Sequence, residues 1–507
     1  MTTPSEKLAE SLDILSQLQS RGGVAVSTKD LTRTHRERLV KNGFLQEVVK
    51  GWYIPSRPDE VQGESTVWYT SFWDFCSTYL TERFGDTWCL SPEQSLSLHS
   101  GNWSVPKQLL IRHPNAMNNV LNLPHGTSLL DIRAAIPPKA QQQQLKGVRV
   151  FSLESALITV SANFFTQHAT DARTAVSMLP DASSLLALLL EGGHSTIAGR
   201  LAGAFRNIGR IRIADDIVSS MTSAGYTIRE SDPFTDKPIL TLAKRELSPY
   251  VNRICLMWET MREPVLEHFP VAPNVTINPD DYIKQVEESY VNDAYHSLSI
   301  EGYQVTPELI DRVRTGDWNP NSNTEDREQR NALAARGYWQ AFQAVEKSIA
   351  HILKGKNAGA VVDHDHSTWY RELFAPSVTA GLLRPADLAG YRSNPVYIRR
   401  SMHVPPSHEA VRDIMPVFFE MLEEETEPAV RVVLGHFVFV YIHPYSDGNG
   451  RIGRFLMNAM LASGGYPWTV IPVDKRQDYM TALEQASVGQ DIVPFTQFVA
   501  RLVEGSF

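Results

Sequence analysis

The chain has few cysteines, no long apolar run and no excess of positive charge. Its cysteines are Cys76, Cys89 and Cys255, and none forms a C-x-x-C pair. This argues against a disulfide scaffold or a zinc ribbon and favours a reducing compartment. The most apolar runs, 185–190 and 437–442, are too short to cross a bilayer, and the polar start of the chain offers no signal-peptide core. We therefore expect a cytoplasmic protein without membrane contact.

The bulk composition limits the classes of protein that remain. The 507 residues carry a formal net charge of -9, so no global field attracts nucleic acid, and any DNA contact needs a local basic patch. A hydrophobic content of 42% is that of a globular protein, and the length indicates about two to four domains. Proline-containing seams predict a chain in four parts. These are a winged helix-turn-helix (1–58), an α+β middle domain (59–230), a linker (231–238) and a C-terminal domain (239–507). The chain is expected to be mainly α, because a family resemblance given below implies an all-α C-terminal domain with a small β-hairpin.

The N-terminal part combines short helices with a hairpin. Leucines at 8, 12, 15 and 18 form one face of a first helix, Ser27 can cap a second over 28–31, and a third is expected over about 34–41. Lys50-Gly51 then joins two short strands. The endings Gly43-Phe44-Leu45 and Gly51–Pro55 resemble the N-terminal domain of AbiEi-type antitoxin regulators.

That resemblance, together with local charge, raises the question of DNA binding. Residues 27–57 hold seven Lys/Arg against three acids. A recognition helix would place Arg33, Arg36 or Arg38 near phosphates or base edges. The alternative is that the winged helix serves only in protein interaction or dimerisation.

The densest chemistry lies in one string near the C-terminus, His443–Arg454, which reads H-P-Y-S-D-G-N-G-R-I-G-R. An apolar helical run precedes it and a second helix follows. Its glycines, Gly448 and Gly450, permit a loop whose backbone N–H groups point outward at a helix N-terminus, and such a place binds phosphates. Arg451 and Arg454 lie on neighbouring positions of that helix and can hold a polyphosphate.

Two further side chains complete the chemistry of this string. Asp447 is a carboxylate beside the phosphate position, which is the usual protein ligand for Mg²⁺. His443 lies at the end of the preceding helix, and an imidazole suits a general base at neutral pH. A base, a metal ligand and an anion site therefore fall close together.

The string is similar to the signature of the Fic family, H-x-F-x-[DE]-G-N-G-R-x-x-R, with Tyr445 in place of the usual Phe. The resemblance implies a protein adenylyltransferase. The equivalent of His443 deprotonates a Ser, Thr or Tyr hydroxyl of a target protein, which attacks the α-phosphate of ATP. Asp447 would hold Mg²⁺, the 448–450 amides with Asn449 would form the anion hole, and the two arginines would hold the β- and γ-phosphates. The tyrosine at 445 keeps the shape of Phe but needs a partner for its hydroxyl.

A second motif indicates autoinhibition. Ser297-Leu298-Ser299-Ile300-Glu301-Gly302 matches the family's inhibitory pattern [ST]-x-x-x-E-[GN]. Ser297 and Glu301 are four apart and share a helix face. Glu301 can then pair with Arg454, so that ATP binds only unproductively.

Three weaker features complete the prediction. Gly390-Tyr391-Arg392, followed by Val396, Tyr397 and Ile398, resembles the family's target-docking flap, and the alternation predicts an edge strand onto which a target segment can pair. Tyr479 is a candidate for the adenine pocket. The run 363–366 (D-H-D-H) could bind a metal, but a polar loop is the simpler interpretation.

Two alternative functions stay open. The first is a DNA-binding regulator in which the Fic fold acts as a nucleotide sensor, as in a toxin-like enzyme fused to its own repressor. The second is the reverse reaction, in which Glu301 activates water and removes AMP from a modified protein. A homo-oligomer is compatible with each of these readings.

Overall fold

The computed structural model describes residues 3–20, 24–58, 65–235, 248–273, 278–316 and 326–505, without the side chains of 326–329. It divides into two compact units. The first comprises residues 1–253 together with 397–404, and the second comprises 254–396 and 405–507. The last three residues of the predicted linker 231–238 and the start of the predicted domain at 239 fall in 236–247, outside the described residues. Across the described ranges, no helix is both long and apolar enough to pass through a membrane.

The N-terminal region of the first unit contains two helices and a three-stranded antiparallel sheet of order β1-β3-β2. The predicted first and third helices and the hairpin are confirmed. The predicted helix over 28–31 is wrong: those residues form a turn, in which Ser27 Oγ accepts from the backbone N–H of Lys29 and the N–H of Thr28 donates to the carbonyl of Gly51. The elements are α1 (Pro4–Ser20), β1 (Val26–Ser27), α2 (Arg33–Lys41), β2 (Leu45–Val49) and β3 (Trp52–Pro55).

The middle region is built on a four-stranded sheet of order β4-β5-β7-β6, in which β5 and β7 are parallel. Helix α3 packs on the core of this region with an aromatic face that includes Trp68, Phe72 and Phe75, all fully buried. The strands are β4 (Cys89–Leu90), β5 (Gln108–His113), β6 (Val120–Asn122), β7 (Ser128–Arg133), β8 (Gln142–Leu145) and β9 (Val148–Phe151). The helices are α3 (Thr66–Phe84), α4 (Pro92–His99), α5 (Leu153–Thr159), α6 (Asn163–Gln167), α7 (Ala169–Ser177), α8 (Ser183–Gly192), α9 (Ser195–Asn207) and α10 (Ile211–Ser223).

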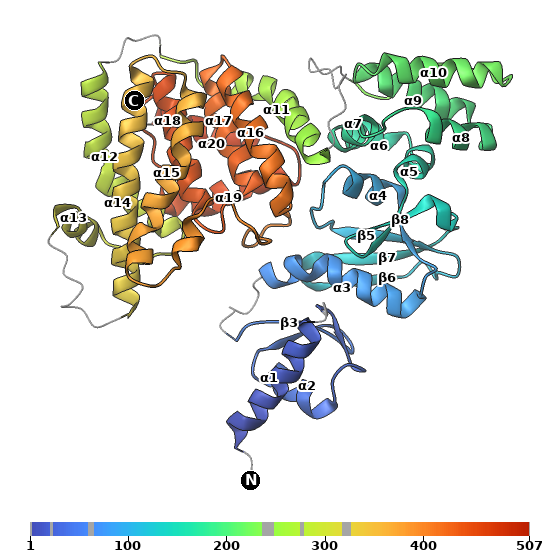
Figure 1. Ribbon diagram of the computed structural model, residues 1–507, viewed down its shortest axis with the longest axis horizontal. Helices are drawn as coiled ribbons and strands as arrows, with labels where there is room; N and C mark the ends of the chain where they lie inside the picture. Colours follow the sequence, from blue (N-terminus) through green and yellow to red (C-terminus); the bar gives the residue numbers. More distant parts are fainter. Residues whose placement is uncertain are drawn as a thin grey trace. The chain divides into compact units, whose positions relative to one another are not determined.

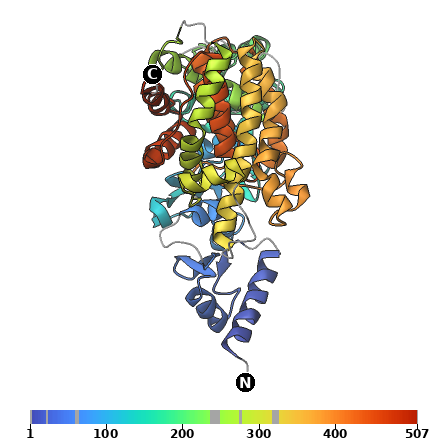
Figure 2. The ribbon, with the colours of Figure 1, turned by 90° about the vertical axis from the view of Figure 1, so that its left-hand side faces the viewer.

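The second unit is a helical bundle around α17 and α18, which pack closely on each other (Figure 1). The long helices α14 and α15 run side by side, as the yellow and orange helices of Figure 2 show. All but two residues of α18 are buried, which fixes its N-terminus in place. The helices are α11 (Pro249–His268, entering from the first unit), α12 (Pro279–Ile300), α13 (Pro307–Thr315), α14 (Asp326–Leu353), α15 (Ala358–Thr379), α16 (His408–Glu424), α17 (Pro428–Ile442), α18 (Asn449–Ser463), α19 (Arg476–Ser487) and α20 (Val493–Glu504).

Candidate active site

The candidate site is the loop that joins α17 to α18. Helix α17 ends at Ile442. The capping residue His443 has a left-handed backbone (φ 54°), and Pro444 prevents the helix from continuing. Gly448 is also left-handed (φ 81°), and a Cβ there would lie 2.9 Å from the ring of Phe374, so glycine is needed both for the turn and for the close approach. Helix α18 begins at the next residue, so the loop presents its N-terminus to the site.

The side chain of Asn449 braces this loop from inside. Its Oδ1 accepts from the backbone N–H of Tyr445, and its Nδ2 donates to the carbonyl of the same residue, both at 2.9 Å. Because the side chain is 1% exposed, these bonds are shielded from water. Asn449 therefore fixes the loop in this structure, and this role does not depend on a bound phosphate.

A second brace is Arg392, which the sequence analysis quoted but gave no role. Its Nε donates to the carbonyl of His443 at 2.8 Å, and its Nη2 donates to the carbonyl of Pro406 at 2.5 Å. Its own backbone N–H donates to the carbonyl of Pro444 at 2.9 Å. Burial lowers the pKa of Arg392 to about 10, which still leaves it charged at neutral pH. An arginine before a proline-rich stretch is the only sequence signal, and it does not reveal these contacts.

His443 is half-buried, and its Nδ1 faces the carbonyl of Val440 at 3.2 Å. That contact is a hydrogen bond when Nδ1 carries the proton, which leaves Nε2 as the basic nitrogen. Burial lowers the pKa of His443 to about 4. The ring is then neutral at pH 7 and able to accept a proton, which is the state that a general base requires.

Asp447 is the exposed member of the loop, with a side chain 66% accessible. Its Oδ1 accepts from the N–H of Gly448 at 2.6 Å, and Nη2 of Arg451 lies 3.4 Å from Oδ2. In the described part of the chain no three His, Cys, Asp or Glu side chains gather into a metal cluster. One exposed carboxylate fits Mg²⁺ where phosphates and water supply the other ligands, which is how this ion is usually held beside nucleotides.

Arg451 is held by aromatic rings. Its guanidinium lies 5.3 Å from the ring centre of Tyr303 and 5.0 Å from that of Phe374, so the cation faces two π-systems. Neither ring was predicted as part of the site, and no sequence pattern links them to it. The side chain is 2% exposed, and its Nε has no hydrogen-bond partner among the described residues.

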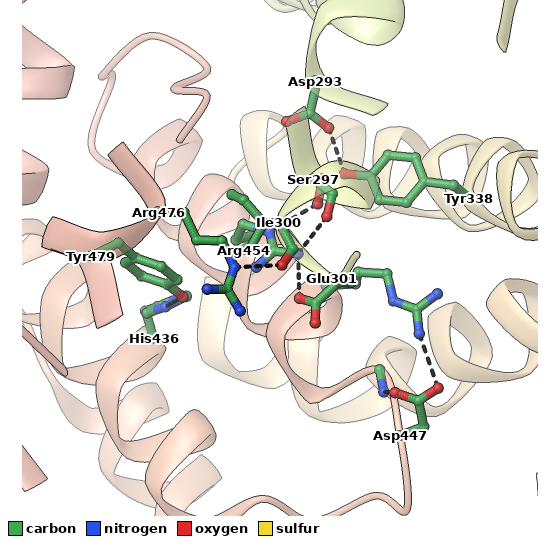
Figure 3. A network of polar contacts seen from close by, with 12 residues as sticks. Asp293, Ser297, Ile300, Glu301, Tyr338, His436, Asp447, Arg454, Arg476 and Tyr479 are labelled. Atoms are coloured by element: carbon green, nitrogen blue, oxygen red, sulfur yellow. Dashed lines mark hydrogen bonds and ion pairs between the residues drawn. The ribbon is translucent and has the colours of Figure 1, made fainter. Parts of the chain in front are cut away.

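The predicted ion pair between Glu301 and Arg454 is formed. Nη2 of Arg454 lies 2.7 Å from Oε1 of Glu301, and its Nε donates to Oγ of Ser297 at 2.8 Å. Figure 3 shows both residues of the α12 end pointing at this one arginine. Burial opposes the ionised form of Glu301, but the charges of Arg454 and Arg451 outweigh it and hold the pKa of Glu301 below its usual value. Gly302 is left-handed (φ 88°) and lets the chain leave the helix at this point.

The carboxylate of Glu301 also occupies the start of α18. A Cβ at Gly450 would collide with Glu301 Oε1 and would lie 3.1 Å from Nη1 of Arg454. That Nη1 is buried and, like Nε of Arg451, finds no acceptor within the described ranges. Two guanidinium donors without a partner in the described ranges, beside a helix N-terminus, are suited to bind an anion with several oxygen atoms, such as a phosphate.

Two predicted features differ from the structure. Residues 393–398 form neither helix nor strand, so the predicted edge strand at Val396, Tyr397 and Ile398 is wrong; Pro395 interrupts the alternation, and the next residues turn at Arg400 (φ 61°). The run 363–366 is not a loop but part of α15, where His366 is buried and Nε2 faces Oη of Tyr391 at 2.9 Å.

Two tyrosines near the site, Tyr479 and Tyr445, have surroundings that their residue type alone does not predict. Tyr479 is 1% exposed and its hydroxyl is 2.7 Å from Nε2 of His436, so in this state it belongs to the core beneath the site. Tyr445 stacks on Tyr370 with ring centres 3.9 Å apart. No protein atom in the described ranges hydrogen-bonds its hydroxyl.

The three arginines predicted for DNA all lie on α2 but have different surroundings. Arg33 is 83% exposed and pairs with Glu37 at 2.6 Å. Arg36 lies over the ring of Tyr53 at 5.7 Å. Arg38 donates to the carbonyl of Lys7 and to Ser11, and so ties α2 to α1. DNA binding and the winged-helix assignment stay predictions.

The site thus has the parts of a nucleotide-handling centre: a neutral imidazole, an exposed carboxylate and two buried cations around a helix N-terminus. Comparison with known proteins agrees with this class. Residues 366–461 match the Fic/DOC family profile, so the second unit contains a Fic-type domain.

Relatives of known name are similar to part of the chain. The "Protein adenylyltransferase Fic" of Nematostella vectensis is 32% identical over 226 residues, which is 44% of this chain and 48% of that protein. The protein of the same name in Drosophila willistoni is 38% identical over 222 residues, 43% of this chain and 41% of the relative. A solved structure of Caenorhabditis elegans Fic-1 is 19% identical with a TM-score of 0.37, and covers 67% of this chain and 94% of that one. The chain spans less than half the length of these two curated relatives.

Proposed function

We propose that this chain is a protein adenylyltransferase that moves AMP from ATP onto a Ser, Thr or Tyr hydroxyl of a target protein. The observation that carries the proposal is the buried pair of arginines, Arg451 and Arg454, which keep unpaired donors beside the N-terminus of α18. This is a seat for a polyphosphate, and the general base His443 lies on the same loop. The named relatives support the same reaction.

In the proposed reaction the basic nitrogen of His443 takes the proton of the target hydroxyl. The hydroxyl oxygen forms a bond to the α-phosphorus, and the bond from that phosphorus to the bridging oxygen breaks, so pyrophosphate leaves. The N–H groups at the start of α18, with Gly448 and Gly450 in the turn, stabilise the charge that develops on the phosphate oxygens. Arg451 and Arg454 hold the departing phosphates, and Tyr479 closes the core beneath the nucleotide.

Asp447 would hold Mg²⁺ together with the triphosphate. When bound, the ion neutralises phosphate charge and orients the leaving group. The carboxylate is exposed and only weakly engaged by Arg451, so it can turn toward a ligand at small cost.

We further propose that the structure is the inhibited state. Glu301 neutralises Arg454 and fills the space above Gly450, so a γ-phosphate cannot reach that arginine while α12 is in place. Ser297 adds a second bond to the same guanidinium.

The test is incorporation of AMP from ATP labelled on the α-phosphate into the purified chain and into added cell protein. We expect weak labelling by the unchanged chain, stronger labelling by Glu301→Gly and none by Glu301→Gly combined with His443→Ala. Glu288→Gln, an exposed position on the same helix, is the matched control and should behave like the unchanged chain.

Two outcomes would contradict the proposal. If Glu301→Gly does not label, the chain is not the proposed transferase. If the chain labels equally well with and without Glu301, the proposed inhibition is wrong. Loss of AMP from a previously modified protein, dependent on Glu301, would identify the reverse reaction instead.

A further inference from the structure

The inhibitory end of α12 is held by more than the Fic motif. Its last carbonyls need partners, because a helix leaves its final C=O groups without intrahelical donors. The carbonyls of Leu298 and Ser299 accept from the N–H groups of Tyr303 and Gly302 in the turn that follows. The carbonyl of Ile300 accepts from Nε of Arg476, the first residue of α19, at 2.8 Å.

A second contact joins the same two parts of the chain one turn earlier. The ring nitrogen Nδ1 of His296 accepts the backbone N–H of Val473 at 3.1 Å. Burial lowers the pKa of His296, so the ring is neutral at pH 7 and Nδ1 is able to accept. Val473 opens the 3₁₀ turn 473–475 that leads directly into α19.

The chemistry of the contact favours this arrangement. The C-terminus of a helix carries partial negative charge, and a cation there is stabilising. Arg454 and Arg476 approach this end from different elements: Arg454 bonds the carbonyl of Ser297 and the carboxylate of Glu301, and Arg476 bonds the carbonyl of Ile300. Figure 3 shows the two guanidinium groups on the last turn of α12. Of these two arginines, only Arg454 belongs to the proposed phosphate site.

We propose that Arg476 and His296 form a second latch, which sets how firmly Glu301 is held over the site. This inference rests on the proposed autoinhibition. Both are positioning residues: Arg476 and His296 bond the segment that carries Glu301 and none of the loop 443–448. Breaking either contact frees the end of α12 while Glu301 and Arg454 stay unchanged, so the inhibited state loses stability without a change in the catalytic groups. The 473–476 segment is then a place from which inhibition can be relieved.

The experiment compares Arg476→Ala and His296→Leu with Glu301→Gly in the full chain, using self-labelling by ATP and hydrogen exchange of the amides 297–303. We expect each latch variant to raise labelling and exchange by about tenfold, because a hydrogen bond that involves a charged or buried partner is worth about that factor. His296→Asn keeps an acceptor near the position of Nδ1 and should restore inhibition. Lys475→Ala, exposed and next in the chain, is the control that should change nothing.

The double variants separate a latch from a catalytic residue. If Arg476 acts only through Glu301, then Glu301→Gly with Arg476→Ala labels as well as Glu301→Gly alone. Lower labelling by the double variant would place Arg476 in nucleotide binding and overturn the inference. Unchanged labelling and exchange in both latch variants, beside strong labelling by Glu301→Gly, would also overturn it and leave the proposed function intact. Failure of Glu301→Gly to label counts against the proposed function, and the exchange measurement still decides whether the latch holds α12.

Discussion

The carboxylate of Glu301 at the end of α12 lies 2.7 Å from Nη2 of Arg454 on α18, although 153 residues separate the two along the chain. The arginine is 4% exposed and the glutamate 28%. Besides the blocking role that we propose for Glu301, the pair therefore has a structural role, because a buried guanidinium without a counter-charge is costly.

The structural role predicts a stability effect. Glu301→Gln keeps the shape of the side chain but leaves Arg454 uncompensated, and we expect it to destabilise the helical unit by about 1–3 kcal/mol, a value reduced by the partial exposure of Glu301. Calorimetry at pH 7 measures it, and MgATP should raise the melting temperature of the variant more than that of the unchanged chain. An equal ligand response in both would mean that Glu301 and the nucleotide do not compete.

The pH dependence of catalysis follows from the burial of His443. A base with a pKa of about 4 loses activity only as the pH falls through that value, because it is then protonated. For Glu301→Gly we expect kcat/KM for ATP to stay nearly constant from pH 7.5 to about pH 5, since the neutral ring persists over that range. An acid limb centred near 6.5 would show that the ring titrates as it does in water. Circular dichroism at each pH excludes unfolding as the cause of any decline.

The contacts of Arg392 predict an effect on turnover rather than on nucleotide affinity. In the Glu301→Gly background, Arg392→Ala should lower kcat by about 10- to 100-fold, because His443 and Pro444 lose their support, and a misplaced base is costly. KM for ATP should change much less. Arg384→Ala removes an exposed arginine directly before the 3₁₀ turn Pro385–Leu388 and is the control. A parallel rise in KM with kcat unchanged would assign Arg392 to substrate binding.

We expect removal of the Tyr445 hydroxyl to increase the stability of the chain. It is fully buried without a protein partner among the described residues, so Tyr445→Phe should stabilise the chain by about 1 kcal/mol and leave labelling unchanged. Tyr370→Phe is the opposite case, since the hydroxyl of Tyr370 donates to the carbonyl of Asp387 at 3.1 Å and its loss should be destabilising. Comparable destabilisation by both changes would indicate that Tyr445 has a water partner.

The sequence predicted some parts of the fold and the site correctly and missed others. The loop 443–454 was predicted in detail because its proline, glycines and charged residues act locally, and helix spacing alone placed Ser297 and Glu301 on one face. Arg392, Tyr303 and Phe374 were missed because their partners are distant in sequence and include backbone carbonyls or another side chain's guanidinium. The expected strand at 396–398 failed because alternation describes a strand only where a neighbour pairs with it.

The helix over 28–31 failed for a related reason. Ser27 is a good helix cap by type, but its N–H bonds to the carboxylate of Asp30 and the N–H of Thr28 bonds to Gly51, so the backbone of this stretch is engaged by a turn and by the hairpin. At 363–366 the error was the reverse, because a polar loop was predicted where the structure has a helix. The alternating His and Asp residues gave no sign of this helix, whose buried face carries His366.

The bare backbone at Gly450 has one more consequence. Any side chain there would strike Oε1 of Glu301. Under the proposed function, the same side chain would also fill space that the phosphates of ATP would occupy. We therefore expect a mutation at this position that displaces Glu301 to weaken the binding of ATP as well. Constitutively active variants should therefore arise from changes in α12 or in the residues that bond its end. We do not expect them from substitutions at Gly450.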